Sequence, residues 1–195
     1  LNLFLNNKDI EGIILCGEGR TFFAGADISE FGKPMQGPNL NEVIFEFEKS
    51  KKPIVASLHG TPLGGGLELA MGCHYRVASK KTMLGLPEVK LGIIPGAGGT
   101  QRLPKLVGVE KALNMIISSS PIGAEEALKH GLVNEIYDDE LLDNASYGVT
   151  RGTGVLVLEN DKWKIAQYHL TIPVPNGLAK EVVKMIRQTD NTSQK

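Results

Sequence analysis

Cysteine is scarce in this chain of 195 residues, which contains only Cys16 and Cys73. Both lie inside apolar stretches, so we expect reduced, buried thiols rather than a disulfide framework. An excess of charge of one sign is also missing, because the formal net charge is −1. We therefore expect neither nucleic acid nor a membrane surface as a partner. No apolar run approaches the ~20 residues of a membrane-spanning helix, and we expect no secretory signal.

Metal ligands and a serine nucleophile are lacking too. The four histidines show no metal-ligand spacing, so no metal site is predicted. No serine lies in a nucleophile elbow. The rest of the composition, 42% hydrophobic and 22% charged, is ordinary for a globular protein. We expect a cytoplasmic protein, or an organellar one if the source is eukaryotic, whose N-terminus is truncated because the first residue is Leu1.

Strands and helices alternate over the first two thirds of the chain, which predicts an α/β fold. Short apolar runs bounded by glycine or proline predict buried strands, and helical spacing of apolar residues predicts amphipathic helices. The predicted strands are 12–17, 53–59, 74–78, 82–85 and 132–137. The predicted helices are 39–49, 64–73, the segment from the 95–100 turn to residue 106, 109–118 and 124–130.

The pattern changes after about Asp139. The strand-like runs 154–160 and 163–170 flank a tight turn and predict an antiparallel hairpin. Asn176 is expected to cap a helix with an apolar stripe from Leu178 to Ile186. Because a lone hairpin and helix bury little surface, this part must pack on the first part, pair with another chain, or be a fragment.

The segment 61–73 is the most informative part of the sequence. Three glycines, Gly64 to Gly66, open a helix that is apolar on every side except at Glu68. A buried carboxylate is costly unless something pairs or uses it, and the glycines let backbone N–H groups approach a ligand closely. The alternative is that Glu68 only complements the positive end of the helix, which is worth ~0.3–1 kcal/mol.

Three other segments are weaker candidates by themselves. The loop 22–28 follows a buried strand and has free N–H groups, although an ordinary tight loop is the favoured interpretation. Glu88 follows a proline, and its surroundings favour a surface turn. The glycine-rich segment 95–99 fails the G-x-G-x-x-G spacing of a dinucleotide fingerprint, so we expect a tight turn whose backbone helps to seat a ligand.

Together these segments resemble the crotonase (enoyl-CoA hydratase/isomerase) family. The matching pieces, which occur in the family's order and spacing, are 23–28, 64–70, 85–88 and 91–103. The resemblance covers about 12–139 and is closest to the hydratase domains of bifunctional β-oxidation enzymes, through 67–76. It implies a spiral of ββα units that holds an acyl-coenzyme A thioester. We assign 1–143 to this domain and expect it to be incomplete at both ends.

The resemblance also implies the site residues. The N–H groups of Ala26 and Gly65 match the oxyanion hole, and Glu68 and Glu88 match the two catalytic glutamates. Further substrate-binding positions are Ala24, Asp27, Ile28, Gly64 and Gly96. The chemistry fits these roles, because hydration of a 2-enoyl thioester places negative charge on the thioester oxygen, where two N–H donors stabilise it. Two carboxyl groups in unlike environments can hold water over C3 and protonate C2.

The resemblance therefore implies an enoyl-CoA hydratase of fatty-acid β-oxidation, acting on an acyl-CoA thioester. It implies no cofactor beyond the coenzyme A of the substrate, and a homo-oligomer built from trimers. The presence of both glutamates favours hydration. Two alternatives stay open: a Δ3-Δ2-enoyl-CoA isomerase, and a non-catalytic acyl-CoA-binding or assembly module if the truncation removes activity.

The C-terminal part, 144–195, has a different resemblance. Residues 144–187 are similar to the last strands and helix of a SnoaL-like α+β cone domain, through the pieces 152–157, 163–169 and 174–176. The hairpin plus helix would then come from a cone-like fold. A function based on this part, as a dimerising or small-ligand cone, ranks last because most of a cone is missing.

Overall fold

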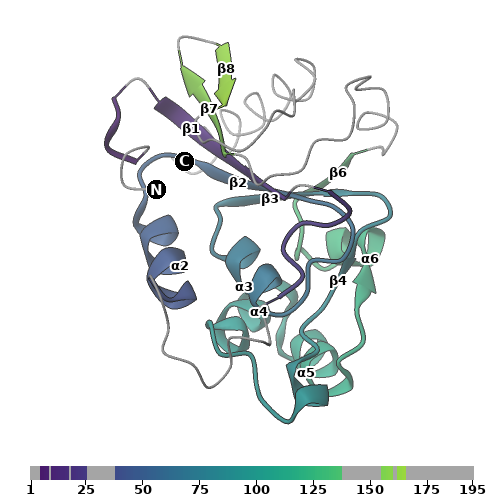
Figure 1. Ribbon diagram of the computed structural model, residues 1–195. Coiled ribbons are helices and arrows are strands. Elements are labelled where there is room, and N and C mark those ends of the chain that lie inside the picture. Colours follow the sequence, from purple (N-terminus) through teal and green to yellow (C-terminus); the bar gives the residue numbers. More distant parts are fainter. Residues whose placement is uncertain are drawn as a thin grey trace, which may run out of the picture.

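The computed structural model describes residues 5–8, 10–17, 19–25, 38–137, 155–159 and 162–165. A six-stranded sheet with the strand order β6-β3-β2-β1-β7-β8 forms its centre. In Figure 1 the helices lie below this sheet, and the β7–β8 hairpin at one edge of the sheet rises above the other strands. The strands of the sheet are β1 (Ile10–Cys16), β2 (Ile54–Leu58), β3 (Tyr75–Ser79), β6 (Glu135–Tyr137), β7 (Val155–Glu159) and β8 (Lys162–Ile165).

Four neighbouring strands of this sheet, β6, β3, β2 and β1, are parallel. Parallel neighbours need crossover connections, and here helices supply them. Helix α2 (Leu40–Lys49) leads from β1 to β2, and α3 (Gly65–Met71) leads from β2 to β3. Strand β2 is an inner strand of the sheet and is almost entirely apolar, with Ile54, Val55, Ala56 and Leu58 fully buried.

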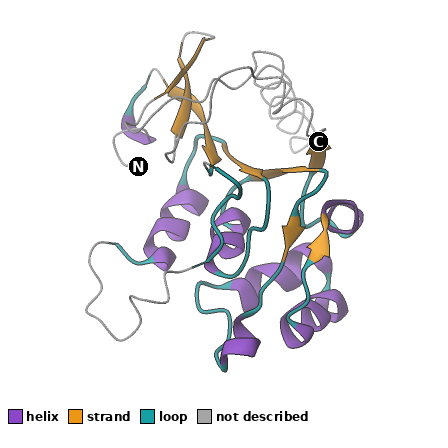
Figure 2. Cartoon of the chain, turned by 45° about the vertical axis from the view of Figure 1, so that its right-hand side comes forward, coloured by secondary structure: helices purple, strands orange, loops and turns teal. Residues whose placement is uncertain are grey.

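A second layer of short elements packs beyond α3. It contains β4 (Met83–Leu84), the 3₁₀ helix η2 (Glu88–Leu91), α4 (Gly99–Val107), α5 (Val109–Ser118), β5 (Ile122–Gly123) and α6 (Ala124–Lys129). Strands β4 and β5 pair antiparallel as a small separate sheet. Figure 2 shows this helical layer below the main sheet. None of the helices in the described ranges is long and apolar enough to cross a bilayer.

Most predicted elements are confirmed to within one to three residues at each end. Helix α2 begins after Asn39, whose side chain accepts the N–H of Glu42 while the Glu42 carboxylate accepts the N–H of Asn39. This reciprocal pair is a capping box, which fixes the start of the helix. Two elements were not predicted, η2 and β5, because each is too short to show a hydrophobic period.

The hairpin 154–170 is confirmed in its described part, where β7 and β8 pair antiparallel. The sequence left open whether this hairpin packs on the first part of the chain, pairs with another chain or is a fragment. The structure shows that it packs on the first part, because β7 pairs antiparallel with β1. Val157 lies opposite Ile13 and Leu156 opposite Ile14. The predicted helix from Asn176 and the boundary between residues 143 and 144 lie outside the described residues.

Candidate active site

A cavity of about 350 Å³ lies where the N-terminus of α3, the segment around η2 and the 95–99 turn meet. Its lining includes the two acidic residues Glu68 and Glu88, together with Gly64 and Gly65. The apolar part of the wall comes from Leu40, Leu91, Ile93 and Ile94. The cavity thus joins two acids, a helix N-terminus and an apolar surface.

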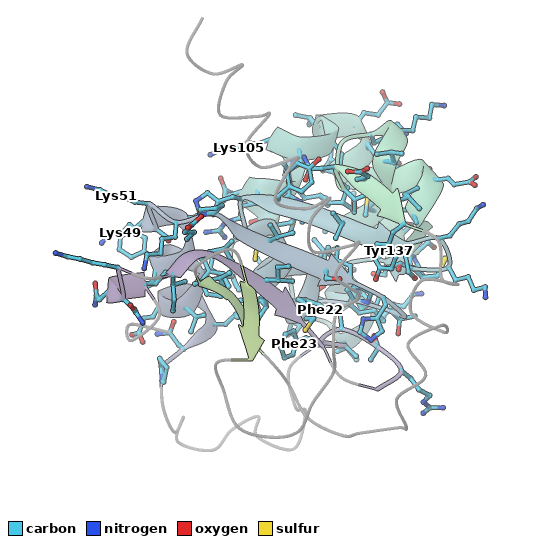
Figure 3. All side chains as sticks on the ribbon, turned by 90° about the horizontal axis from the view of Figure 1, so that it is seen from above. Phe22, Phe23, Lys49, Lys51, Lys105 and Tyr137 are labelled. Carbon is cyan, nitrogen blue, oxygen red and sulfur yellow. The ribbon has the colours of Figure 1, made fainter. Side chains whose placement is uncertain are left out.

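The loop after β1 packs tightly against the first turn of α3. A Cβ at Gly66 would lie 1.9 Å from the carbonyl oxygen of Phe23, so only glycine fits at this crossing. Phe22 anchors the loop, because its ring is buried and meets the Phe23 ring edge to face at 4.7 Å. Figure 3 shows both rings below the end of β1. This packing brings Ala24 and Gly25 to the cavity wall.

Gly64 and Gly65 form the turn into α3. Gly64 has φ +52°, a left-handed value that favours glycine, and its N–H donates to the Gly85 carbonyl at 3.0 Å. Gly65 is the first residue of the helix, so its N–H has no carbonyl one turn earlier to accept it. Since Gly65 lines the cavity, this N–H is available for an oxygen atom of a bound molecule.

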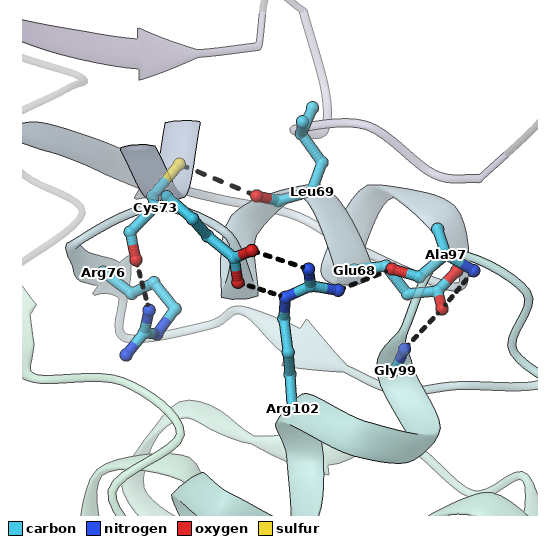
Figure 4. Close-up of polar contacts among 8 residues, drawn as sticks. Glu68, Leu69, Cys73, Arg76, Ala97, Gly99 and Arg102 are labelled. Atoms are coloured by element: carbon cyan, nitrogen blue, oxygen red, sulfur yellow. Dashed lines mark hydrogen bonds and ion pairs between the residues drawn. The ribbon is translucent and has the colours of Figure 1, made fainter. Parts of the chain in front are cut away.

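The Glu68 carboxylate is buried, with a relative exposure of 2%. Its Oε1 atom accepts two backbone hydrogen bonds, from the N–H of Ala97 at 2.8 Å and from the N–H of Gly99 at 2.7 Å. Figure 4 shows these two contacts, with Arg102 beside the same loop. The 95–99 turn therefore seats a side chain of the protein itself. Glu68 is more than a charge at the helix end, which was the alternative interpretation.

Glu88, the first residue of η2, has different surroundings. It is 8% exposed, so the surface turn suggested by its local sequence is wrong. Its Oε2 atom is buried and has no hydrogen-bond partner among the described residues. Burial raises the pKa of Glu88, and the nearby charge of Glu68 adds to the increase, while a backbone hydrogen bond opposes it. A Cβ at Gly64 would lie 2.9 Å from Glu88 Oε1, so glycine there makes room for this carboxyl group.

The structure brings six of the nine predicted site residues to one cavity: Ala24, Gly64, Gly65, Glu68, Glu88 and Gly96. Ala26, Asp27 and Ile28 lie outside the described residues. Two lining residues at the start of α2 were not predicted: Asn39, which caps the helix, and Asn41 in its first turn. The capping pattern at Asn39 predicts a helix start but gives no signal for a cavity.

The remaining reactive side chains lie elsewhere. Burial raises the pKa of Cys73 to about 12 and also raises that of Cys16, which is only partly buried. His74 accepts the backbone N–H of Ile54, and burial lowers the pKa of His59. In the described part of the chain, no group of three or more His, Cys, Asp or Glu side chains is arranged to hold a metal ion.

The chain is similar to one protein family and to several known enzymes. The family model described as enoyl-CoA hydratase/isomerase matches residues 1–151. A peroxisomal bifunctional enzyme of Danio rerio is 42% identical over 174 residues, which cover 89% of this chain and 24% of that protein. A probable enoyl-CoA hydratase of Bacillus subtilis is 50% identical over 139 residues, covering 67% of this chain and 54% of that protein.

Solved structures give the same fold. An enoyl-CoA hydratase from Bacillus anthracis superposes with a TM-score of 0.66 and is 36% identical, covering 73% of this chain and 58% of that one. An enoyl-CoA hydratase from Thermoplasma volcanium superposes with a TM-score of 0.61 at 38% identity. The match covers 67% of this chain and 55% of that one. The chain thus spans between about a quarter and little more than half of the length of these relatives.

Proposed function

The chain belongs to the enoyl-CoA hydratase/isomerase family, and from this membership we propose that it is an enoyl-CoA hydratase of fatty-acid β-oxidation. It would add water across the 2,3 double bond of a 2-enoyl-CoA. One observation carries the proposal: two buried carboxyl groups, Glu68 and Glu88, line one cavity but have unlike surroundings. Hydration needs two such groups, because water must be held at C3 while a proton is delivered to C2.

The thioester carbonyl would bind at the N-terminus of α3. The N–H of Gly65 would donate to its oxygen, and the N–H of Ala26 would be the second donor. As water adds to C3, negative charge develops on this oxygen in an enolate. Loss of one such donor typically costs ~10²–10³-fold in rate. The apolar wall of Leu91, Ile93 and Ile94 suits the start of an acyl chain.

The two acids would divide the proton transfers. Glu68 Oε1 already accepts two N–H groups, which leaves Oε2 to hold the water and take its proton as the C3–O bond forms. Glu88 would give its proton to C2, and its raised pKa supports a protonated donor. One water is consumed, its hydroxyl goes to C3 and a proton goes to C2. Transfer of a proton from Glu68 back to Glu88 through solvent would restore the starting state.

The test is a hydration assay on crotonyl-CoA, followed by loss of its absorbance, beside an isomerisation assay on a 3-enoyl-CoA. We expect hydration to be the faster reaction, and Glu68→Gln and Glu88→Gln each to lower its kcat by about 10²–10⁴-fold. Faster isomerisation would favour the isomerase. Binding of the thioester without turnover would favour a non-catalytic acyl-CoA-binding module. Hydration that is unaffected by Glu88→Gln would refute the role of Glu88.

Four further properties are part of the proposal. The chain would need no cofactor besides the coenzyme A of its substrate, and it would form a homo-oligomer of the trimeric type. Its location would be cytoplasmic, or organellar if the source is eukaryotic, where the names of peroxisomal and glyoxysomal relatives support the second location. Residues 1–143 would form the catalytic domain, and 144–195 would be a SnoaL-like addition.

A further inference from the structure

The turn that holds Glu68 is itself tied to α2 at two points. The side-chain amide of Asn41, in the first turn of α2, donates to the Gly96 carbonyl at 3.3 Å. Glu48 lies seven residues later, on the same face of the helix. It binds the Arg102 guanidinium in a bidentate ion pair, at 2.7 Å to Nε and 3.0 Å to Nη2.

Arg102 continues this connection into the turn. Its Nη1 atom donates to the Ala97 carbonyl at 2.8 Å, while the Ala97 N–H donates to Glu68 Oε1 at 2.8 Å. The N–H and the carbonyl of one residue therefore hold Glu68 and Arg102, respectively. Glu48 and Glu68 are thus linked through two hydrogen bonds of Arg102, the backbone of Ala97 and the Ala97 N–H. Figure 4 shows the part of this link that runs from Arg102 through Ala97 to Glu68.

The turn is also shaped around Arg102. Gly98 has φ +87°, and a Cβ at this position would lie 2.1 Å from Arg102 Nη1. Glycine suits the left-handed backbone here, and any other residue would push the guanidinium away from its present position. The Glu48–Arg102 pair is partly exposed, with side-chain exposures of 43% and 21%, and such pairs typically add only ~0–1 kcal/mol to stability. Stability alone is a weak reason for this arrangement.

We propose that Arg102 is a positioning residue, which ties the 95–99 turn to α2 and thereby fixes the Glu68 carboxylate in the cavity. Its catalytic consequence rests on the proposed hydratase function. No hydrogen bond joins the guanidinium to Glu68 or Glu88 in the described part of the chain; it reaches the cavity through the Ala97 carbonyl, and the Ala97 N–H holds Glu68. We therefore expect its effect to pass through Glu68. Removing it should misplace Glu68 while the oxyanion donor Gly65 and the acid Glu88 stay in place.

The activity experiment compares Arg102→Met with the parent on crotonyl-CoA. We expect kcat to fall about 10–100-fold, the scale expected for a misplaced catalytic group, and KM to change less than about threefold. Arg102→Lys keeps the positive charge but loses the planar guanidinium that binds Glu48 and Ala97 together, so it should recover only part of kcat. Lys111→Met, which breaks the Lys111–Glu126 ion pair outside the cavity lining, is the control and should leave kcat unchanged.

A double-mutant comparison separates positioning from a merely structural role. In a Glu68→Gln background, Arg102→Met should lower kcat by less than about twofold, because residues that act as one unit are not additive. In a Glu88→Gln background the full effect should persist. Equal losses in the parent and in both backgrounds would overturn the proposal.

A third measurement needs no turnover, so it tests the connection even if the hydratase proposal fails. Amide hydrogen exchange by NMR should be faster at Ala97 and Gly99 in Arg102→Met than in the parent, with Lys111→Met unchanged. If Arg102→Met does not fold, Glu48→Gln removes the anchor on α2 and should give the same pattern at smaller size. Unchanged exchange at both amides would overturn the proposal, whereas faster exchange in a chain without hydration would refute only the hydratase function.

Discussion

Replacing Glu88 by glutamine removes an ionisable carboxyl group that is buried and whose Oε2 atom lacks a partner within the described residues. An unpaired buried polar group costs about 1–3 kcal/mol, and a charged one costs more. Glutamine has nearly the same shape and carries no charge. We therefore expect Glu88→Gln to raise the free energy of unfolding by about 1 kcal/mol at pH 8, while it removes the proton that C2 needs.

The sign can be checked through pH. Burial raises the pKa of Glu88 in the folded state, so the folded chain keeps this proton to a higher pH than the unfolded chain, where the pKa is about 4.3. The contribution of the protonated group to stability is complete below the unfolded pKa and is lost as pH rises through the folded value. The gain from Glu88→Gln should thus be small near pH 4 and reach a plateau above the folded pKa.

The assay is urea unfolding followed by circular dichroism, from pH 4 to pH 8, beside the crotonyl-CoA assay. Glu126→Gln is the control with the opposite sign, because the hydrogen bond from Lys111 lowers the pKa of Glu126. The Glu126 carboxylate contributes to stability above its unfolded pKa. Relative to the parent, the Glu126→Gln variant should therefore become less stable as pH rises. A Glu88→Gln variant that is less stable than the parent at pH 8 would show that the carboxylate is paired, and the reasoning would be refuted.

Three other predictions concern Gly64 beside Glu88, the buried Arg76 and the two cysteines. Gly64→Ala should lower kcat about 10–100-fold with KM nearly unchanged, because its Cβ would press on Glu88 Oε1 at 2.9 Å and displace a catalytic group; an unchanged kcat would contradict this. Arg76→Met should lower the free energy of unfolding by about 2–4 kcal/mol in urea, since two buried carbonyl groups lose their guanidinium donor. Iodoacetamide should label Cys16 well before Cys73, whose pKa of about 12 suppresses the thiolate; mass spectrometry of the peptides would reveal the reverse order.

Much of the fold could be predicted from local patterns. Helix α5 (Val109–Ser118) has the predicted bounds, and α2 starts where its capping box indicates. The pairing of β4 with β5 could not be predicted, because it joins Leu84 to Ile122 across a long stretch of chain. The strand at 82–85 was predicted, but its partner β5 is too short to show a period of its own.

The part of the site that depends on neighbouring residues was predicted, and the part that depends on distant contacts was not. The buried acid on α3 follows from its apolar neighbours, whereas the burial of Glu88 depends on the distant backbone of Gly64. No local feature of the sequence indicates this contact. The roles of Asn41 and Arg102 were missed because their partners lie 55 and 54 residues away in the sequence. Such contacts become visible only when the elements are placed in space.

The antiparallel pairing of β7 with β1 has a consequence for contacts between molecules. Without the hairpin, β1 would be the outermost strand, and Ile13, Ile14 and Leu15 would lose their backbone partners on β7. An uncovered row of N–H and C=O groups is a template for pairing with another molecule, and here it would be long and apolar. We therefore expect a chain shortened to end at Tyr137 to self-associate, and we expect the hairpin to protect this edge from other molecules.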